Sequence, residues 1–311
     1  MIELNHVSKM YGNVVGVNDL TLHIPRGAYG LIGPNGSGKT TLINLLIGHF
    51  RPTLGSLQVL GTTPTRDRRL LRRIGLCPAS DVLYPNVSAL EWVRYQVRLH
   101  GISRRECRPL AEEALETVGM TSAMHRPMGT YSLGMRQRTK IAQAIAHQPE
   151  LLILDEPYNG LDPVGRNDMT QLLKQWTRSG RGLIFASHVL QEIESVTASF
   201  LLLHGGRILA SGTAQEIESI LTDTPQEVCI KGPDAAKLIH RLADVDWVDA
   251  LQLNHGKNEL RVSLREPAEF YGRIASWIRD DNLAIDQLQT PDGNIEAVFE
   301  SILRRHRGET S

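Results

Sequence analysis

Short segments of alternating apolar and polar residues mark the beginning of the chain, at residues 2–4 and 20–24. Alternation with a period of two residues, interrupted by glycine and proline, is typical of strands that are buried on one face. Residues 56–60 form a further predicted strand, which ends at Gly61. We therefore expect an antiparallel β region near the N-terminal end.

Apolar residues then recur at helical spacing from residue 88 to about residue 130, which predicts an all-helical insertion. Before it, the basic stretch 66–73 predicts an amphipathic helix with arginines on its solvated face, to which we assign no function. After it, strands and helices alternate, which favours an α/β fold with a mostly parallel sheet. The predicted elements are strands at 151–154 and 182–186, helices near 164–178 and 189–196, and a hairpin at 200–203 and 207–210.

The pattern changes after about residue 221, and residues 222–226 are a plausible linker. Beyond it we expect strands at 227–230, 248–254, 259–264 and 284–289, and helices at 234–242, 267–278 and 294–303. A strand–helix–strand–strand–helix–strand order would form a small ferredoxin-like α+β domain. The chain thus divides into a large domain, residues 1–220, and a small one, residues 226–311.

Composition narrows the classes of protein. The 311 residues include 34 Lys and Arg against 34 Asp and Glu, so the formal net charge is zero and nucleic acid is not an expected partner. No apolar run approaches the ~18 residues that span a bilayer, and no secretion signal begins the chain. The three cysteines form no C-x-x-C pair, so neither a disulfide framework nor a zinc site is predicted. These observations predict a soluble, reduced, cytoplasmic protein.

Residues 33–41 read Gly-Pro-Asn-Gly-Ser-Gly-Lys-Thr-Thr and fit the phosphate-loop pattern G-x-x-x-x-G-K-[ST]. An apolar strand precedes the loop and an apolar helix follows it, which is the context that the pattern requires. Backbone N–H groups of such a loop surround phosphate oxygens, and the helix N-terminus favours the anion. Lys39 would reach the β- and γ-phosphates, and the Thr40 hydroxyl would bind Mg²⁺. The loop predicts a nucleotide site.

Two acidic residues follow the apolar strand 151–154 directly. Asp155, at the carboxyl end of that strand, should lie beside the phosphate loop and hold Mg²⁺. Glu156 is a candidate general base for an attacking water. His188 ends the next predicted strand and could contact the γ-phosphate or orient the water, although a histidine there is more often a capping or packing residue. Tyr11 could stack on adenine, but its position alone favours a turn or core tyrosine.

Taken together, these motifs resemble the ATP-binding subunit of an ABC transporter over residues 1 to about 220. Residues 33–41 match its Walker A loop, 151–156 its Walker B strand and catalytic glutamate, 131–135 its signature, 160–162 its D-loop, His188 its switch histidine and Tyr11 its adenine-stacking aromatic. The resemblance implies a P-loop NTPase fold with an antiparallel β subdomain and a helical subdomain at about 88–130. It implies ATP contacts at Tyr11, Asn35, Gly36, Ser37, Gly38, Lys39, Thr40, Thr41, Ser132, Gly134 and Asp162, Mg²⁺ at Thr40 and Asp155, and catalysis by Glu156 and His188.

The sequence departs from the family pattern at two places. In the signature, Leu133 and Met135 replace a glycine and a glutamine, while Ser132 and Gly134, which match the residues that face the partner's γ-phosphate, remain. Ala79 stands where the family usually has a glutamine that touches Mg²⁺ and water. Its side chain can do neither, so Ser80 or Asp81 would have to substitute, or hydrolysis would be slow or differently coupled.

The resemblance implies a mechanism and partners. Two ATPase subunits, alike or merely similar, would pack head to tail with ATP between the Walker A loop of one and the signature of the other. Movement would pass through the helical insertion and the 77–88 loop to a separate multi-spanning permease, at the cytoplasmic face of the membrane. By analogy the chain is similar to drug, lipid or ion exporters. Two alternatives remain: a soluble ABC ATPase in translation or DNA repair, and a regulatory protein in which ATP acts as a clamp.

Overall fold

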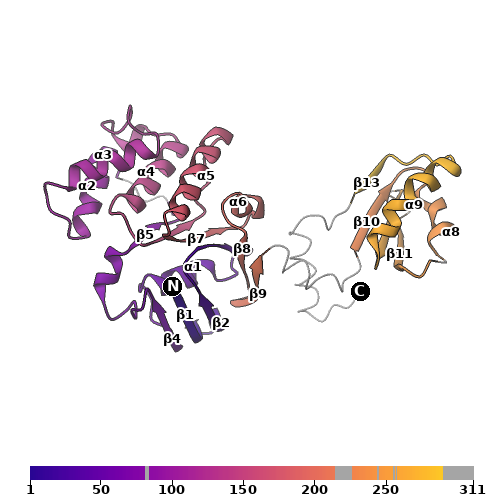
Figure 1. Cartoon of the computed structure of the whole chain (residues 1–311), viewed down its shortest axis with the longest axis horizontal. Coiled ribbons are helices and arrows are strands. Elements are labelled where there is room, and N and C mark those ends of the chain that lie inside the picture. The colour runs from indigo at the N-terminus through magenta and orange to yellow at the C-terminus, as the bar shows by residue number, and fades with distance from the viewer. Residues whose placement is uncertain (81–83, 214–225, 244, 255, 257, 290–311) are drawn as a thin grey trace. The chain divides into compact units, whose positions relative to one another are not determined.

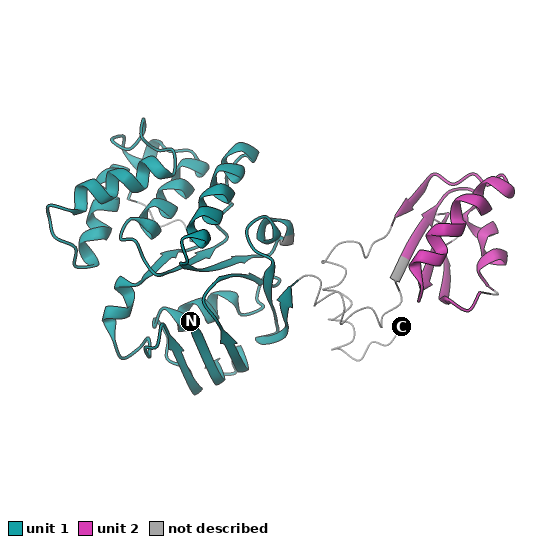
Figure 2. Cartoon of the chain, in the orientation of Figure 1, with its two compact units in different colours: residues 1–213 teal, residues 214–311 magenta. Residues whose placement is uncertain are grey.

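The computed structural model describes residues 1–80, 84–213, 226–243, 245–254, 256 and 258–289. The chain separates into two compact units, residues 1–213 and 214–311 (Figure 2). The expected boundary, between residues 220 and 226, falls largely on residues outside the described part, as do the expected linker and the expected helix 294–303.

The alternating segments near the N-terminus form an antiparallel sheet in unit 1, as expected. Strand β1, Ile2–Tyr11, pairs on one side with β2, Val14–Ile24, and on the other with β4, Leu54–Val59. Apolar side chains of β1 at positions 2 and 4 are buried, while Glu3 between them is exposed. The period of two in the sequence is thus the period of the sheet.

A six-stranded sheet forms the centre of unit 1, in the order β5-β6-β7-β3-β8-β9. Its first five strands are parallel and β9 is antiparallel to β8. Strands β6 and β7 are buried along their whole length, as expected for apolar strands covered on both faces. The six are β5, Ile74–Cys77; β6, Leu151–Asp155; β7, Gly182–Ser187; β3, Ala28–Ile32; β8, Ser199–His204; and β9, Arg207–Thr213.

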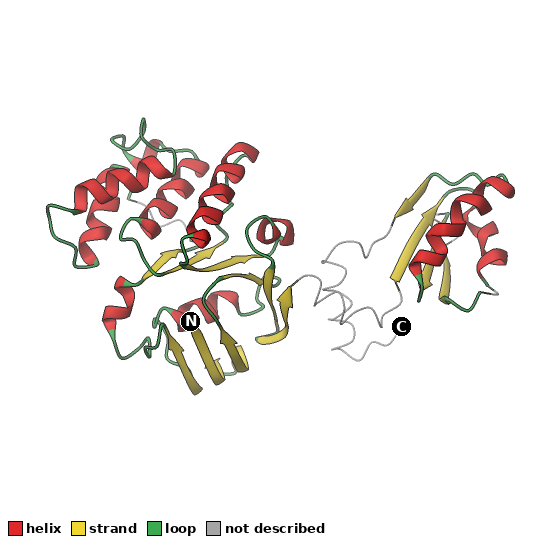
Figure 3. Cartoon of the chain, in the orientation of Figure 1, coloured by secondary structure: helices red, strands yellow, loops and turns green. Residues whose placement is uncertain are grey.

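Helices cover this sheet, and three of them gather on one side of unit 1 (Figures 1 and 3). These three, the helical layer, are α2, Ala89–Leu99; α3, Cys107–Thr117; and α4, Leu133–Ile145. The helical region therefore continues past residue 130, with the short 3₁₀ helix η2, Met128–Thr130, before α4. The other helices of unit 1 are α1, Lys39–Leu46; α5, Pro163–Arg178; and α6, Leu190–Glu194.

The basic stretch 66–73 does not form the amphipathic helix that its pattern predicts. It contains a five-residue 3₁₀ helix, η1, Arg68–Arg72, which begins where the Asp67 carboxylate accepts the N–H of Arg69. Only Leu70 of this helix is buried, because β5 begins at Ile74 and leaves room for little more than one turn. The expectation of a longer helix here was wrong.

Unit 2 is a four-stranded antiparallel sheet with helices, in the order β11-β12-β10-β13. Its elements follow the order expected for a ferredoxin-like unit. Trp247 and Trp277 stack within its core with ring centroids 6.2 Å apart. The elements are β10, Gln226–Lys231; η3, Ala235–Leu238, running into α8, Ile239–Leu242; β11, Val248–Asn254; β12, Glu259–Leu264; α9, Pro267–Asp280; and β13, Gln287–Gln289.

Candidate functional site

Three neighbouring parallel strands bring the predicted chemistry to one edge of the central sheet. In the order β6-β7-β3, their carboxyl ends lead to Asp155 and Glu156, to Ser187 and His188, and to the phosphate loop. Ligands of open α/β sheets bind outside the carboxyl ends of the strands. Segments that lie more than 100 residues apart in the chain therefore meet at the predicted site.

The backbone of the phosphate loop takes conformations that favour glycine. Gly36 has φ of 80° and Gly38 has φ of 109°, in the region that side chains with a Cβ rarely adopt. Gly38 directly precedes α1, whose N-terminus has no side-chain cap. The first N–H groups of α1 have no acceptor within the helix, so they point outward and, with the helix dipole, favour an anion.

Lys39 lies in the floor of the loop. Its ammonium donates to the carbonyl oxygens of Gly33, at 2.5 Å, and Pro34, at 3.2 Å, and the side chain is almost fully buried. Burial lowers the pKa of Lys39, and the negative charges of Glu156 and Asp155 oppose that shift. Beside it, the buried Ser37 hydroxyl has no hydrogen-bond partner among the described residues. A bound phosphate would supply an acceptor to both groups.

Thr40 and Asp155 form the oxygen pair that was predicted to hold a metal. The Thr40 hydroxyl lies 3.5 Å from Oδ2 of Asp155, and the aspartate is 5% exposed. Burial raises the pKa of the Asp155 carboxyl, and the nearby charge of Glu156 raises it further, while Lys39 counteracts both. A divalent cation would relieve the same repulsion, and hydroxyl and carboxylate oxygens are the ligands that Mg²⁺ prefers.

Glu156 and His188 contact each other. Nδ1 of His188 lies 2.8 Å from Oε1 of Glu156, and the glutamate side chain is 12% exposed against 51% for the histidine. Glu156 has φ of 52°, a left-handed conformation that costs a residue with a side chain on the order of 1–3 kcal/mol. Such strain is common at functional sites, and here it turns the carboxylate from β6 towards the end of β7.

Tyr11 ends β1 directly before the turn at residues 12–13 and is 41% exposed, so of the two alternatives, a turn or a core tyrosine, the core is excluded. Its ring packs edge-on against Phe50, with centroids 5.6 Å apart, and the ammonium of Lys9 lies 5.4 Å from its centroid. Its hydroxyl lies 3.5 Å from the hydroxyl of Thr41 in the phosphate loop. The aromatic ring therefore lies beside the phosphate loop.

The signature residues lie at the start of α4. The Ser132 hydroxyl accepts the N–H of Met135 and caps the helix. A Cβ at Gly134 would lie 2.9 Å from the Gly160 carbonyl oxygen, so the signature and the D-loop are in close contact. Asp162 caps α5 by accepting the N–H of Gly165 at 2.9 Å. Within the described residues, no hydrogen bond joins Ser132 or Asp162 to the phosphate loop.

Sequence analysis gave no role to three buried polar side chains on α4, Gln137, Thr139 and Lys140. The Gln137 amide donates to the Pro157 carbonyl at 2.9 Å, behind Glu156. Lys140 donates to carbonyl oxygens of residues 78–80. The only signal in the sequence was a polar run, residues 136–140, that continues into the buried part of an amphipathic helix.

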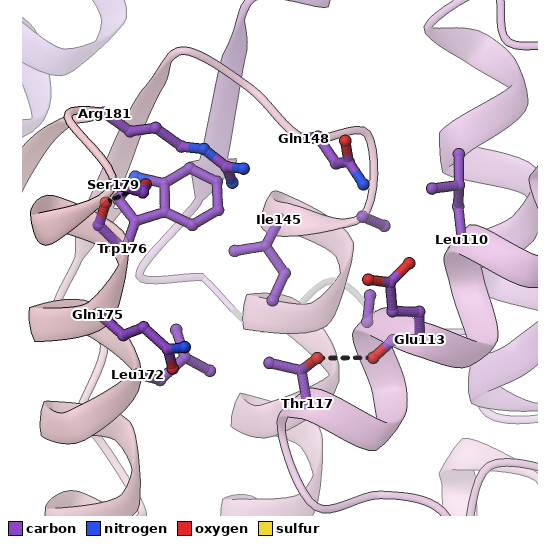
Figure 4. A pocket seen from close by; sticks show the side chains of 12 residues that line it. Leu110, Glu113, Thr117, Ile145, Gln148, Leu172, Gln175, Trp176, Ser179 and Arg181 are labelled. Carbon is purple, nitrogen blue, oxygen red and sulfur yellow. Dashed lines mark hydrogen bonds between the residues drawn. The ribbon is translucent and has the colours of Figure 1, made fainter.

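A cavity of about 350 Å³ lies elsewhere, between α3, the end of α4 and α5 (Figure 4). Trp176 lines it, with the Arg181 guanidinium stacked on the indole at 4.3 Å. None of its lining residues belongs to the motifs described above. The cavity is therefore separate from the candidate nucleotide site.

Comparison with known proteins agrees with these motifs. A family model described as ABC transporter matches residues 17–159. The bacitracin transport ATP-binding protein BcrA of Bacillus licheniformis is 37% identical over 67% of this chain and 68% of its own length. Two relatives match almost end to end. The bacitracin transport ATP-binding protein BcrA of Enterococcus faecalis is 30% identical over 97% of this chain and 96% of its own length. The linearmycin resistance ATP-binding protein LnrL of Bacillus subtilis (strain 168) is 29% identical over 98% of this chain and 99% of its own length.

Solved structures agree in fold. An ATP-binding subunit of an ABC transporter is 28% identical, with a TM-score of 0.66 over 71% of this chain and 93% of that one. The dimeric bacterial ABC transporter cassette MJ0796 is 25% identical, with a TM-score of 0.64 over 68% of this chain and 98% of that one. None of the described helices is both long and apolar enough to cross a membrane. The chain belongs to the ABC transporter family, as an ATP-binding subunit that hydrolyses ATP to drive transport through a separate membrane permease.

Proposed function

We propose that this subunit powers the export of an antibiotic similar to those for which its relatives are named, bacitracin and linearmycin. The supporting observation is the match along the whole chain, unit 2 included, to relatives named for bacitracin transport and linearmycin resistance. A match confined to the ATPase unit would support ATP hydrolysis and leave the substrate class open, because the ATPase motifs are common to the family.

In this proposal the phosphate loop holds the nucleotide and each neighbouring strand end has one task. Lys39 turns from the loop carbonyls to the β- and γ-phosphates, and Tyr11 stacks on the adenine. Thr40 and Asp155 would hold Mg²⁺, which would neutralise charge on the phosphates. Glu156 takes the proton of the attacking water, and His188 leaves Glu156 to contact the γ-phosphate.

A second ATPase subunit, identical or similar, completes each site. Ser132, Gly134 and Asp162 of one chain would face the nucleotide of the other, in a head-to-tail pair. Backbone N–H groups at the start of α4 would then surround the γ-phosphate, where charge develops in the transition state. Because one chain carries half of each site, hydrolysis should require the pair.

The permease would contact the helical layer beside residues 77–88, at the cytoplasmic face of the membrane. An aromatic cluster supports this place. Tyr84 is 58% exposed and packs on Trp92, which packs on Tyr95 at 56% exposed, and Leu99 follows one turn later on α2 at 63% exposed. Aromatic side chains are enriched where protein interfaces form.

Replacement of Glu156 by Gln tests the mechanism. The amide keeps the shape but cannot act as a base, so Glu156→Gln should bind ATP, lose at least about a hundredfold in kcat and accumulate as an ATP-bound dimer. Gel filtration with light scattering, with and without Mg²⁺-ATP, measures the dimer. The control is Lys39→Ala together with Glu156→Gln, which should stay monomeric. A Glu156→Gln protein that remains monomeric at saturating ATP would contradict the head-to-tail mechanism.

Two experiments test the transport proposal. Purification of the tagged chain from detergent-solubilised host membranes should recover a multi-spanning protein in stoichiometric amount. Ribosomes or nucleic acid in its place would favour a soluble ABC ATPase.

Deletion of the gene should make the host more sensitive to bacitracin-like or linearmycin-like compounds, and the wild-type gene, but not the Glu156→Gln gene, should restore resistance. Unchanged sensitivity to both classes would contradict the substrate proposal.

A further inference from the structure

A single buried lysine holds the loop that follows β5. Nζ of Lys140 lies 3.0 Å from the carbonyl oxygen of Pro78, 3.3 Å from that of Ala79 and 3.2 Å from that of Ser80. The lysine is 5% exposed, and its positive charge lowers the pKa of the Asp155 carboxyl, although no ion pair within 4 Å joins it to a described carboxylate. A buried ammonium is stable only when its donors are used, so these three carbonyls are its hydrogen-bond acceptors.

The same helix also holds the turn that carries Glu156. One turn before Lys140 on α4, the Gln137 amide lies 2.9 Å from the Pro157 carbonyl oxygen, 3.5 Å from that of Glu156 and 3.7 Å from the Cys77 sulfur. Helix α4 also lies directly against the backbone of β5, because a Cβ at Gly75 on β5 would collide with the carbonyl oxygen of Ala144 on α4. Helix α4 therefore carries two side chains that reach the backbone just after two neighbouring strands: Lys140 after β5, and Gln137 after β6.

We propose that Lys140 is a positioning residue that ties residues 78–80 to the signature helix, so that α4 moves this loop as one body with the capped end at Ser132. The inference rests on the proposed function, because Ser132 gains a role only when it faces the nucleotide of a second chain. Ala79 offers a methyl group and no ligand, so this loop is held through its main chain. A movement of α4, caused by contact of Ser132 with the nucleotide of a second chain, would then be transmitted through Lys140 and Gln137 to the surroundings of the chain's own predicted metal ligands.

Lys140→Met separates this role from a general contribution to folding. Methionine keeps the length of the buried chain but has no donor, so the three carbonyls lose their shared ammonium. Lys140→Arg keeps the charge and the donors and should rescue part of the effect. The control is Lys174→Met on α5, a lysine whose side chain makes no hydrogen bond or ion pair with residues 77–80 among the described residues.

The first measurement uses the full chain without nucleotide. Hydrogen–deuterium exchange should rise about tenfold in peptides that cover residues 77–80 in Lys140→Met, and should stay unchanged there in Lys174→Met. Exchange in α5 should be the same in both variants. If residues 77–80 exchange at the wild-type rate in Lys140→Met, the proposed tie does not exist. This outcome is independent of whether the chain hydrolyses ATP.

The second measurement is hydrolysis by the wild type and both variants. Lys140→Met should lower kcat about tenfold and change the affinity for ATP less than about twofold, because the loop is positioned rather than the nucleotide bound. An equal loss of affinity and kcat, or a wild-type kcat, would overturn the positioning role. A wild type that hydrolyses no ATP would instead count against the proposed function, and the exchange result would still decide the inference.

Discussion

At the scale of single residues, a pair of histidines shows how packing sets chemistry. His100, at the end of α2, and His147, after α4, stack with centroids 3.6 Å apart and planes within 5°. Nε2 of His147 lies 3.0 Å from the Ile74 carbonyl oxygen, so the imidazole donates there while Nδ1 has no partner among the described residues. Burial lowers the pKa of His147 to about 4, and the neighbouring His100 lowers it as well.

This histidine should make stability depend on pH. The unfolded chain binds the proton near pH 6.5, whereas the folded chain binds it near 4, so the unfolded state holds more protons between these values. The contribution of His147 to the free energy of unfolding is complete above about pH 6.5. It is lost as the pH falls towards 4, and the loss is at most about 3 kcal/mol. Urea unfolding at pH 7, 6 and 5 measures it.

The control for this prediction is an exposed histidine. His147→Gln, whose amide can still donate to Ile74, should flatten the decline in unfolding free energy between pH 7 and 5. His23→Gln should not, because the His23 side chain is 68% exposed. Equal slopes for wild type and His147→Gln would show that other groups cause the acid sensitivity.

At the scale of elements, Asp162 gives a prediction for the start of α5. Its carboxylate accepts the N–H of Gly165, and Pro163 occupies the first helical position, where its missing N–H costs nothing. Asp162→Ala should lower the free energy of unfolding by about 1 kcal/mol, and Asp162→Asn, which also caps well, should lower it much less. Thermal denaturation followed by circular dichroism compares the two.

The same pair of variants separates two roles for Asp162. If the residue acts only as a cap, Asp162→Asn should hydrolyse ATP at the wild-type rate. A loss of kcat in Asp162→Asn without a loss of stability would support the contact across the dimer that the family resemblance implies. The structure of a single chain places the carboxylate on its own helix.

Elements with strong local patterns could be predicted from the sequence, and those set by distant contacts could not. Strands β11 and β12 have the predicted bounds, 248–254 and 259–264, and the apolar strands β6 and β7 were recognisable as buried. The length of helix η1 was overestimated. The spacing of the arginines predicts a polar helix face, but it does not show how few residues precede β5. Helix 234–242 is divided into a 3₁₀ and an α segment, a distinction that periodicity does not resolve.

The candidate site follows the same rule. Motif spacing placed Lys39, Thr40, Asp155 and Glu156 at one sheet edge, because carboxyl ends of parallel strands meet there. The hydrogen bonds from Lys140 to the carbonyl oxygens of residues 78–80 join positions about 60 residues apart in the sequence. They depend on α4 lying against β5, so the local sequence does not predict them. Nor does a sequence reveal that Glu156 adopts a left-handed conformation.

At the scale of the whole molecule, all the ATPase motifs lie in unit 1. The unit has its own core, and unit 2 has another, so residues 1–213 should fold alone and bind ATP within about threefold of the full chain's affinity. Titration of both proteins with a fluorescent nucleotide measures this. A fragment that folds but binds ATP poorly would show that unit 2 contributes to the nucleotide site.

The hydrogen bond between Glu156 and His188 lies within one chain, so no partner is needed to form it. A subunit that has not yet met a second copy therefore already has its carboxylate and imidazole in contact. Assembly of the pair would then have to bring only the missing surface to a carboxylate whose orientation is already set.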